Sequence, residues 1–322
     1  MIYNIAVDSG GTKVLALLYD ENYNLLKTVR VGSMRTNTTS NELIEKNLDE
    51  LEQGLFGDSS PEIGCLSGAL TKVLVDRLSK KYRINKILNL NELILGMNAA
   101  FIFGDGLMSL SGTGATTFAR IGGKPYYLGG YGAAVSDEGS GYWKGRIAFD
   151  AAIKSFEGRG RKTLLEKLLC NKLGNNNLRD AVMSIYSQPG ISPVAFVASC
   201  SPLVDEAAYM GDEAAIDIIG AVGESLGDQL NAIVRMNGIS SNVPVTVSGS
   251  VWKGHPLMFT RFCEKIREVS ENRPIVIPEF EPIIGAIIEH YKSENKEFDD
   301  QIKQRFRNVY SEYFFKTNNK NN

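Results

Sequence analysis

The sequence predicts an α/β fold of two domains, and three observations support that prediction. Two widely separated segments, residues 5–18 and 108–119, each run strand, glycine turn, strand. Between and after them, apolar strand-like runs alternate with segments of helical periodicity. The chain has 322 residues, 43% of them hydrophobic, which is enough for two cores. Because glycine lets phosphate oxygens approach backbone N–H groups, two such hairpins facing one another would cradle phosphates and indicate a nucleotide-using enzyme.

The elements after the first hairpin alternate in type. Leucine and isoleucine recur at helical spacing over residues 41–55, behind a cap rich in threonine and serine. A short apolar strand at 63–67, a helix at 70–82 and a strand at 86–90 follow. Glu92 comes just after that last strand. The carboxyl ends of strands border the crevice where α/β folds bind ligands, so Glu92 is a candidate for chemistry.

The second half repeats this order with longer helices. Strands are expected at 108–110, 116–121, 125–128, 243–250 and 274–278, and helices at 141–155, 162–172, 192–209, 212–236 and 256–269. A last helix precedes a polar tail, for which disorder is expected. Gly227, inside the longest of these helices, has two interpretations: it lets a nucleotide base lie against the helix, or it lets another helix pack closely.

Composition excludes several classes of protein. The formal net charge of −2 gives no general attraction to nucleic acid or to anionic lipid. There is no apolar run near the ~20 residues that a membrane span needs, nor an N-terminal signal, so we expect a cytoplasmic protein with no membrane and no nucleic-acid partner.

The four cysteines, at 65, 170, 200 and 263, form no C-x-x-C pair. This spacing argues against a zinc site and a disulfide framework and favours buried, reduced thiols. The two histidines, His255 and His290, are not near a serine or cysteine elbow, which makes a hydrolase triad a poor interpretation.

Five motifs in order resemble one known family. They are DSGGTK at 8–13, SGTG at 111–114, GGYG at 129–132, DEGSGYW at 137–143 and GSVW at 249–252. Together they resemble the N-acetylglucosamine kinase branch of the BadF/BadG/BcrA/BcrD ATPase family, within the superfamily of actin, sugar kinases and Hsp70 ATPases. The resemblance runs from residue 1 to about residue 290, and the DEGSGYW block is its most specific part.

The resemblance implies two ribonuclease H-like (actin-like ATPase) domains with a cleft between them. We expect the first domain to span residues 1–112, joined by a C-terminal helix at about 286–313. The second domain is expected at 113–285 and a disordered tail at 314–322. The resemblance also implies a homodimer, and a closing motion of the two domains that excludes water from the site.

The phosphate side of the site follows from the first, second and last motifs. The resemblance assigns ATP phosphates to Gly10, Gly11, Thr12, Lys13, Gly112, Thr113 and Gly114, and the nucleoside to Gly249 and Ser250. Lys13 would place positive charge where phosphoryl transfer develops negative charge. Asp8 would hold Mg²⁺ through water, and its structural alternative is a strand-end carboxylate that accepts hydrogen bonds from the turn.

The acceptor side departs from the family pattern. Glu92 occupies the position of the family's catalytic aspartate, and it would accept the proton of the sugar's primary hydroxyl as that hydroxyl attacks the γ-phosphate. The resemblance assigns sugar contacts to Asn37, Gly129, Gly130, Tyr131 and Asp137. Tyr131 stands where the family has tryptophan. N-acetylglucosamine is the first choice of sugar, with N-acetylmuramic acid, glucosamine and other amino sugars open.

Several roles keep alternatives. Asn37 also suits a plain turn, and Glu138 also suits the cap of the helix expected near residue 142. A different function in the same family is an ATP-driven activator, which would need an iron–sulfur cluster between subunits and for which Cys170 and Cys200 have the only remotely suitable separation. A third is a sugar-sensing protein that binds without turnover.

Overall fold

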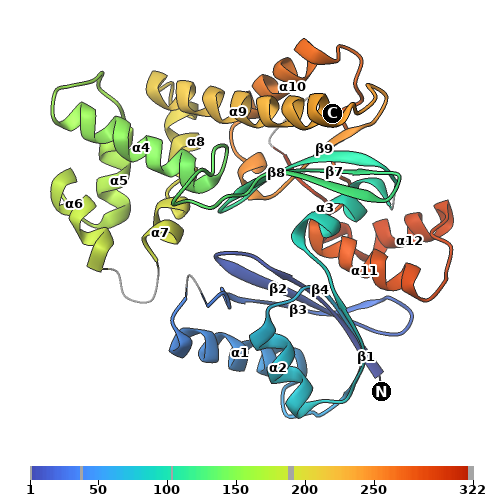
Figure 1. Cartoon of the computed structure of the whole chain (residues 1–322). Helices are drawn as coiled ribbons and strands as arrows, with labels where there is room; N and C mark the ends of the chain where they lie inside the picture. The colour runs from blue at the N-terminus through green and yellow to red at the C-terminus, as the bar shows by residue number, and fades with distance from the viewer. Residues whose placement is uncertain (1, 37–38, 103, 188–191, 318–322) are drawn as a thin grey trace. The chain divides into compact units, whose positions relative to one another are not determined.

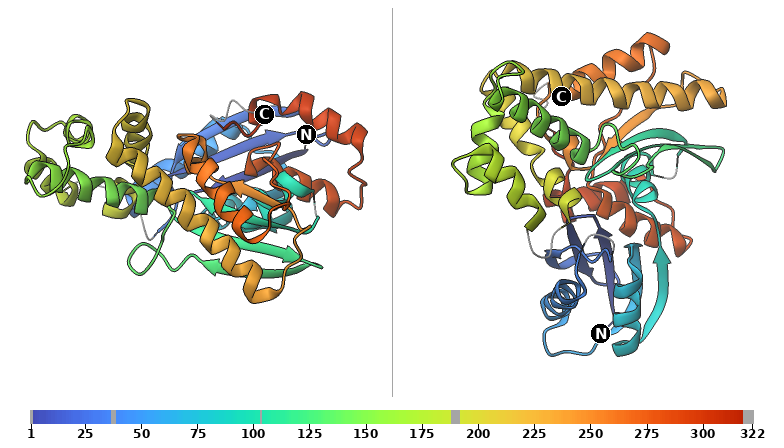
Figure 2. Two further views of the ribbon diagram at one scale, coloured as in Figure 1. Left: turned by 90° about the horizontal axis from the view of Figure 1, so that it is seen from above. Right: turned by 60° about the vertical axis from the view of Figure 1, so that its left-hand side comes forward.

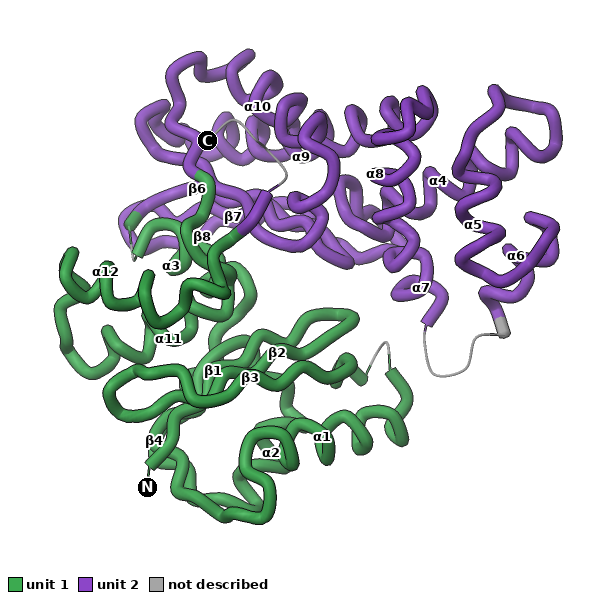
Figure 3. Tube along the Cα trace, turned by 180° about the vertical axis from the view of Figure 1, so that it is seen from behind, with its two compact units in different colours: residues 1–104, 277–315 green, residues 105–276, 316–322 purple. Residues whose placement is uncertain are grey.

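Each half of the chain contributes one β-sheet in the computed structural model, which describes residues 2–36, 39–102, 104–187 and 192–317. The elements gather into two compact units (Figure 3). Unit 1 consists of residues 1–104 and 277–315, and unit 2 of residues 105–276 and 316–322. The α/β class predicted from the sequence is confirmed.

The sheet of unit 1 has the strand order β3-β2-β1-β4-β5. Its strands are β1 (Ile2–Ser9), β2 (Lys13–Tyr19), β3 (Leu25–Gly32), β4 (Glu62–Ala69) and β5 (Ile84–Asn89). The first three pair antiparallel, whereas β4 lies parallel to both β1 and β5. The carboxyl ends of β1, β4 and β5 therefore share one edge of the sheet, which brings the residues after β1 and β5 to the same side.

Alternating side chains of β1 explain why both faces of this sheet are covered. Ile5 and Val7 enter a core with α1 (Asn41–Phe56) and α2 (Lys72–Lys81), whereas Ala6 faces a second core. That second core includes α3 (Glu92–Phe101), α11 (Pro282–Ser293) and α12 (Asp300–Val309). Figure 1 shows α1 and α2 in blue beside β1–β4.

The sheet of unit 2 repeats the order in shorter form, β8-β7-β6-β9. Its strands are β6 (Gly106–Ser111), β7 (Ala115–Ile121), β8 (Lys124–Gly129) and β9 (Val245–Ser248). The strand predicted at 274–278 is wrong: that segment forms only an isolated bridge from Ile275 to Val245. Pro274 and Pro278 lack the N–H groups that a longer ladder needs.

The helices of unit 2 are α4 (Gly141–Phe156), α5 (Leu165–Leu173), α6 (Leu178–Ser184), α7 (Pro193–Ser199), α8 (Pro202–Tyr209), α9 (Glu213–Asn237) and α10 (Leu257–Val269). Short 3₁₀ turns cover Ile185–Ser187 and Ser250–Lys253. The single helix predicted at 192–209 is wrong, because Pro202 starts a new helix. The helix α6 was not predicted.

Close packing of α9 and α10 decides the role of Gly227. A Cβ atom at Gly227 would lie 2.5 Å from Cβ of Lys265, and one at Gly223 would lie 2.2 Å from the carbonyl oxygen of Met258. Both neighbours belong to α10, which lies beside the long helix α9 in Figure 2. Of the two interpretations of Gly227, the helix-packing one is therefore supported.

The C-terminal segment differs from its prediction in two ways. The expected helix at 286–313 is divided into α11, α12 and a 3₁₀ turn at Ser311–Tyr313. The disordered tail was predicted to start at residue 314, which is too early, because Phe314 stacks on Phe280 and Phe315 is buried. Residues 318–322 lie outside the described residues.

The units divide at 104/105 and 276/277, whereas the sequence placed the boundaries at 112/113 and 285/286. The first difference has a simple cause, since β6 pairs with β7 and β9 and so belongs to the second sheet. Among the described residues, no helix has both the length and the apolar character needed to cross a membrane.

Candidate active site

The first glycine turn closes the hairpin between β1 and β2. The N–H of Gly10 donates to the carbonyl oxygen of Lys13 at 2.9 Å. Asp8 precedes the turn within β1, and Thr12 and Lys13 follow it on the surface. The turn therefore presents backbone N–H groups, a hydroxyl and an ammonium group beside one carboxylate.

The segment after β3 supports this turn from outside the hairpin. The hydroxyl of Ser33 donates to the carbonyl oxygen of Gly10 at 3.4 Å, and Nη2 of Arg35 donates to that of Ser9 at 3.2 Å. Asn47 on α1 in turn donates to the carbonyl oxygen of Ser33 at 2.9 Å. Two side chains of the segment after β3 thus fix carbonyl groups of the turn, and α1 holds that segment in place.

Glu92 is the first residue of α3, a helix that the sequence analysis did not predict. Asn91 caps this helix, since its side chain accepts a hydrogen bond from the N–H of Ile94 at 2.8 Å. A carboxylate at this position is favoured by the positive end of the helix dipole. The helix thus places Glu92 at the edge where β5 ends.

Arg35 joins Glu92 to the first glycine turn. Its guanidinium forms an ion pair with the carboxylate of Glu92, and the two side chains are 40% and 31% exposed. Burial lowers the pKa of Arg35, and the charge of nearby Asp8 opposes that shift. One guanidinium therefore interacts with both carboxylates, so the structure brings Asp8, the Gly10–Gly11 turn and Glu92 together in unit 1.

Sequence reasoning missed Arg35 and Ser33 as parts of this site. Their signal was position alone: they precede Asn37 directly after β3, in a segment already assigned to the sugar. Asn37 itself lies outside the described residues.

The second glycine turn, between β6 and β7, is held by backbone hydrogen bonds. The N–H of Gly112 donates to the carbonyl oxygen of Gly114 at 2.9 Å. The carbonyl oxygens of Gly112 and Thr113 accept from Gly141 at 2.7 Å and from Tyr142 at 3.2 Å. Both donors belong to the first turn of α4, where N–H groups have no partner within the helix itself. This helix end therefore fixes the glycine turn.

The strand end at Gly249 packs directly on the second turn. A Cβ atom at Gly249 would lie 2.2 Å from the carbonyl oxygen of Ser111, and its φ of 102° is one that only glycine adopts readily. The hydroxyl of Ser111 also donates to the carbonyl oxygen of Gly139 at 2.6 Å. Three of the sequence motifs, at 111–114, 137–143 and 249–252, therefore meet in unit 2.

Asp137 faces the second turn as well. Its Oδ1 accepts a hydrogen bond from the N–H of Ala115 at 3.0 Å. Burial raises the pKa of Asp137, while hydrogen bonds from Ala115 and Ser140 oppose the shift. Gly129 lies opposite Thr116, the next residue of β7, which places the predicted sugar-binding glycines near Asp137.

Tyr131 and Glu138, on either side of Asp137 in the sequence, differ in their surroundings. Tyr131 is 71% exposed. Glu138 accepts a hydrogen bond from the hydroxyl of Ser225 at 3.3 Å, and Ser140 caps α4. The alternative role of Glu138 as the cap of that helix is therefore wrong.

A buried ion pair lies next to this block. Nζ of Lys144 is 2.6 Å from Oδ1 of Asp205, and the lysine side chain is 1% exposed. Burial lowers the pKa of Lys144, and Asp205 opposes that shift. Asp205 also accepts from the N–H of His255 at 2.9 Å, so it ties α4 and α8 to the segment before α10.

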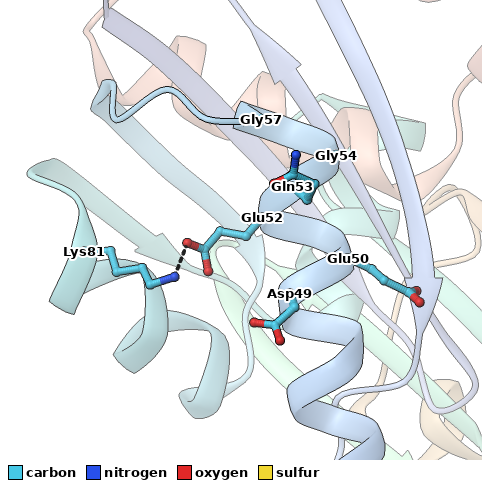
Figure 4. A pocket seen from close by; sticks show the side chains of 7 residues that line it. All are labelled: Asp49, Glu50, Glu52, Gln53, Gly54, Gly57 and Lys81. Carbon is cyan, nitrogen blue, oxygen red and sulfur yellow. Dashed lines mark hydrogen bonds and ion pairs between the residues drawn. The ribbon is translucent and has the colours of Figure 1, made fainter.

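A cavity of about 670 Å³ in unit 1 does not contain the predicted site residues (Figure 4). It is lined by Asp49, Glu50, Glu52, Gln53, Gly54, Gly57 and Lys81. Glu52 pairs with Arg77 and Lys81, and hydrogen bonds from these cations and from Tyr82 oppose the effect of its burial and lower its pKa. Glu52 and Lys81 thus have a structural role, because their ion pairs join α1 to α2.

The cysteines do not suit a bridging iron–sulfur cluster. All four are buried. Burial raises the pKa of Cys170 on α5 and of Cys200 at the end of α7, whereas cluster ligands must be thiolates. This argues against the activator alternative.

The fold and these two glycine turns define a class of ATPase, and a comparison with family models agrees. Residues 5–289 match the model of the BadF/BadG/BcrA/BcrD ATPase family. The chain therefore belongs to that family, which implies that it uses ATP.

Solved structures share its fold. A putative N-acetylglucosamine kinase from Chromobacterium violaceum superposes with a TM-score of 0.66 at 21% identity, covering 89% of this chain and 98% of that one. One from Porphyromonas gingivalis gives 0.66 at 19% identity, covering 92% and 100%. A glucokinase from Streptomyces griseus gives 0.54 at 17%, covering 89% and 97%. The expected α/β fold with two sheets is therefore shared with these solved structures.

Two characterised relatives are similar along nearly their whole length. The N-acetylmuramic acid/N-acetylglucosamine kinase of Clostridium acetobutylicum is 27% identical over 301 residues, covering 89% of this chain and 98% of the relative. The N-acetyl-D-glucosamine kinase of Dictyostelium discoideum is 26% identical over 310 residues, covering 88% and 96%.

Proposed function

We propose that this protein is an ATP-dependent kinase that phosphorylates the primary hydroxyl of an N-acetylated amino sugar, with N-acetylglucosamine as the first candidate and its 6-phosphate as the product. The observation that carries the proposal is the arrangement in unit 1, where one arginine links Glu92 to the first glycine turn. Relatives named for N-acetylglucosamine and N-acetylmuramic acid support the choice of sugar.

In the proposed reaction, Glu92 is the general base. Its carboxylate accepts the proton of the sugar hydroxyl, the hydroxyl oxygen forms a bond to the γ-phosphorus, and the bond from that phosphorus to the bridging oxygen breaks, releasing ADP. Arg35 fixes the position of the carboxylate through their ion pair. Gly10 closes the turn, since its N–H donates to the carbonyl oxygen of Lys13. The N–H of Gly11, the Thr12 hydroxyl and Lys13 bind the phosphates and stabilise the charge that develops on them.

A magnesium ion fits Asp8 as part of a nucleotide complex. Among the described residues there is no group of three or more His, Cys, Asp or Glu side chains placed to hold a metal. Mg²⁺ bound with a nucleotide needs only one or two carboxylates, because phosphates and water supply the other ligands. Asp8, half-buried before the glycine turn, meets that need; the ion would neutralise phosphate charge.

Unit 2 supplies the other residues that we propose bind the substrates. We assign ATP to the backbone of Gly112, Thr113 and Gly114, to Gly249, which lies against that turn, and to Ser250. We assign the sugar to Asp137, Gly129, Gly130 and Tyr131, with Asn37 in unit 1. We place the enzyme in the cytoplasm and, as the family resemblance implies, as a homodimer.

The test measures ADP release from ATP and Mg²⁺ with a panel of amino sugars, for the wild type and for Glu92→Gln. We expect an N-acetylated amino sugar to raise turnover and Glu92→Gln to lower kcat by about 10²–10⁴-fold. Glu42→Gln is the matched control, since Glu42 is an acidic residue in the first turn of another helix of unit 1.

Two results would contradict the proposal. If no sugar raises ADP release above the rate with ATP alone, the protein is not a sugar kinase. Tight sugar binding without any turnover, measured by calorimetry, would instead indicate a sugar sensor.

A further inference from the structure

A second, smaller cavity of unit 1 adjoins the Arg35–Glu92 pair. Its volume is about 200 Å³. It lies between the segment after β3 and the first turn of α2, and it is lined by Met34, Arg35, Thr36, Thr71, Lys72 and Val73. Arg35 lines this cavity and also forms the ion pair with Glu92, so one side chain borders both the cavity and the proposed catalytic group.

The lining contains two cations and no acid. Arg35 and Lys72 come from separate elements, and Lys72 is exposed. Arg35 shares its charge with Glu92 and with Asp8. Lys72, by contrast, has no acidic group within 4.0 Å among the residues that the structure describes, so its positive charge is available to a ligand. The start of α2 adds the positive end of a helix dipole.

The remaining side chains suit a small branched group. Met34 and Val73 are apolar and offer contacts for carbon atoms. The oxygen of the Thr71 hydroxyl accepts a hydrogen bond from the N–H of Leu74 at 3.4 Å, which leaves its hydrogen to donate. Cations, hydroxyls and a short apolar wall together match a carboxylate carried on two or three carbon atoms.

We propose that this cavity is a subsite for a carboxylate-bearing substituent of the amino sugar, with Lys72 as its principal ligand. The inference rests on the proposed function, since it extends the acceptor site beyond Glu92. It names a substrate class: N-acetylated amino sugars with a short acidic ether substituent, of which N-acetylmuramic acid, with its lactyl group, is the available probe. Neutral sugars bind without using the subsite.

The experiment compares kcat/KM for N-acetylmuramic acid and for N-acetylglucosamine in the wild type, Lys72→Gln and Lys72→Arg. Removing the charge of Lys72 is expected to lower kcat/KM for the acidic sugar about tenfold, mainly through KM, because an interaction with an ionised partner is lost. Lys72→Arg keeps the charge and should retain most of the activity. Values for the neutral sugar should stay within about twofold in all variants.

Lys80→Gln is the matched control, because Lys80 lies in the last turn of the same helix. It removes an equal charge about 12 Å further along, at 1.5 Å per residue, and should leave the ratio of the two sugars unchanged. A methyl ester of N-acetylmuramic acid, which lacks the negative charge, should lose its sensitivity to Lys72→Gln.

The outcomes separate the subsite from the kinase activity. If N-acetylglucosamine is phosphorylated but Lys72→Gln affects both sugars equally, or neither, the subsite proposal is overturned and the kinase proposal stands. The same conclusion follows if only the neutral sugar is turned over. If neither sugar is phosphorylated, the proposed function fails and the subsite fails with it.

Discussion

The two glycine turns look alike in sequence but are held in different ways. In unit 1, side chains hold the turn: Ser33 and Arg35 donate to its carbonyl groups, and charged groups surround it. In unit 2, the backbone holds the turn, through the first N–H groups of α4 and through the close approach of Gly249. The same local motif is thus held by charged and polar side chains in one unit and mainly by backbone groups, with Asp137 beside them, in the other.

This difference separates chemistry from binding. Phosphoryl transfer needs charged groups at fixed positions, and Asp8, Arg35 and Glu92 supply them in unit 1. Binding of a nucleotide by backbone groups needs a stiff frame, which helix ends and glycine contacts supply in unit 2. Variants at Arg35 and Glu92 are therefore expected to change kcat, whereas variants that disturb the frame of the second turn are expected to change stability and nucleotide affinity.

The largest effect is expected for Asp205→Ala in unit 2. It leaves the ammonium group of Lys144 buried without its partner, so the free energy of unfolding should fall by about 3–5 kcal/mol. Both tryptophans, Trp143 and Trp252, belong to unit 2, so their fluorescence during urea unfolding follows this unit.

Asp217→Ala is the control for that variant. It removes an ion pair with Arg161 whose side chains are 67% and 48% exposed, and should cost less than about 1 kcal/mol. If the two variants lost equal free energy of unfolding, the buried Lys144–Asp205 pair would matter no more to stability than an exposed ion pair. The double variant Lys144→Met, Asp205→Leu should recover most of the lost stability.

Gly249→Ala is expected to have the next largest effect. A Cβ atom would collide with the backbone of Ser111 and the φ would be strained, so unit 2 should lose about 2 kcal/mol and bind ATP analogues more weakly. Gly174→Ala serves as the control, because Gly174 has a φ of 66° but no heavy atom within 4 Å of a Cβ. It should cost about 1 kcal/mol with unchanged nucleotide affinity. A similar loss of affinity in both variants would refute the role of this contact.

The smallest of these effects concerns Arg35→Gln in unit 1. Without the guanidinium, the carboxylate of Glu92 loses its partner, and we expect kcat to fall about tenfold for every sugar, with the unfolding of unit 2 unchanged. Arg35→Lys should recover part of kcat, since it keeps the charge but not the planar fork. Arg30→Gln, on the preceding strand, controls for the loss of a nearby surface cation. An unaltered kcat in Arg35→Gln would show that Glu92 needs no positioning.

Much of the fold was predictable from local patterns. Periodicity located α1, α9 and α10 almost to their ends. Errors arose where tertiary pairing decides the outcome. The strand expected at 274–278 is reduced to one β-bridge, from Ile275 to Val245, because prolines flank it. The helix expected at 192–209 divides at Pro202. The helix α3 was missed because it is short, and two of its buried residues, Leu95 and Ala99, belong to a core that includes α11.

The site shows the same division. Asp8, Glu92 and the glycine turns were found from the sequence because their residue types and order carry the signal. Arg35 was not, since an arginine after a strand has no local signature. Its role exists only because β1 and β3 end, and α3 begins, near one another.

By itself, the sequence determined the class of fold, the family, the two glycine turns that we propose bind phosphate, and the candidate base. Glycine, capping residues and apolar periodicity act over a few residues, so they can be recognised without coordinates. The tertiary structure alone decided that Arg35 links Glu92 to the first turn, that Gly227 serves helix packing, and that Lys72 borders a cavity. These relations depend on which distant segments meet, and on the burial and charge that each meeting creates.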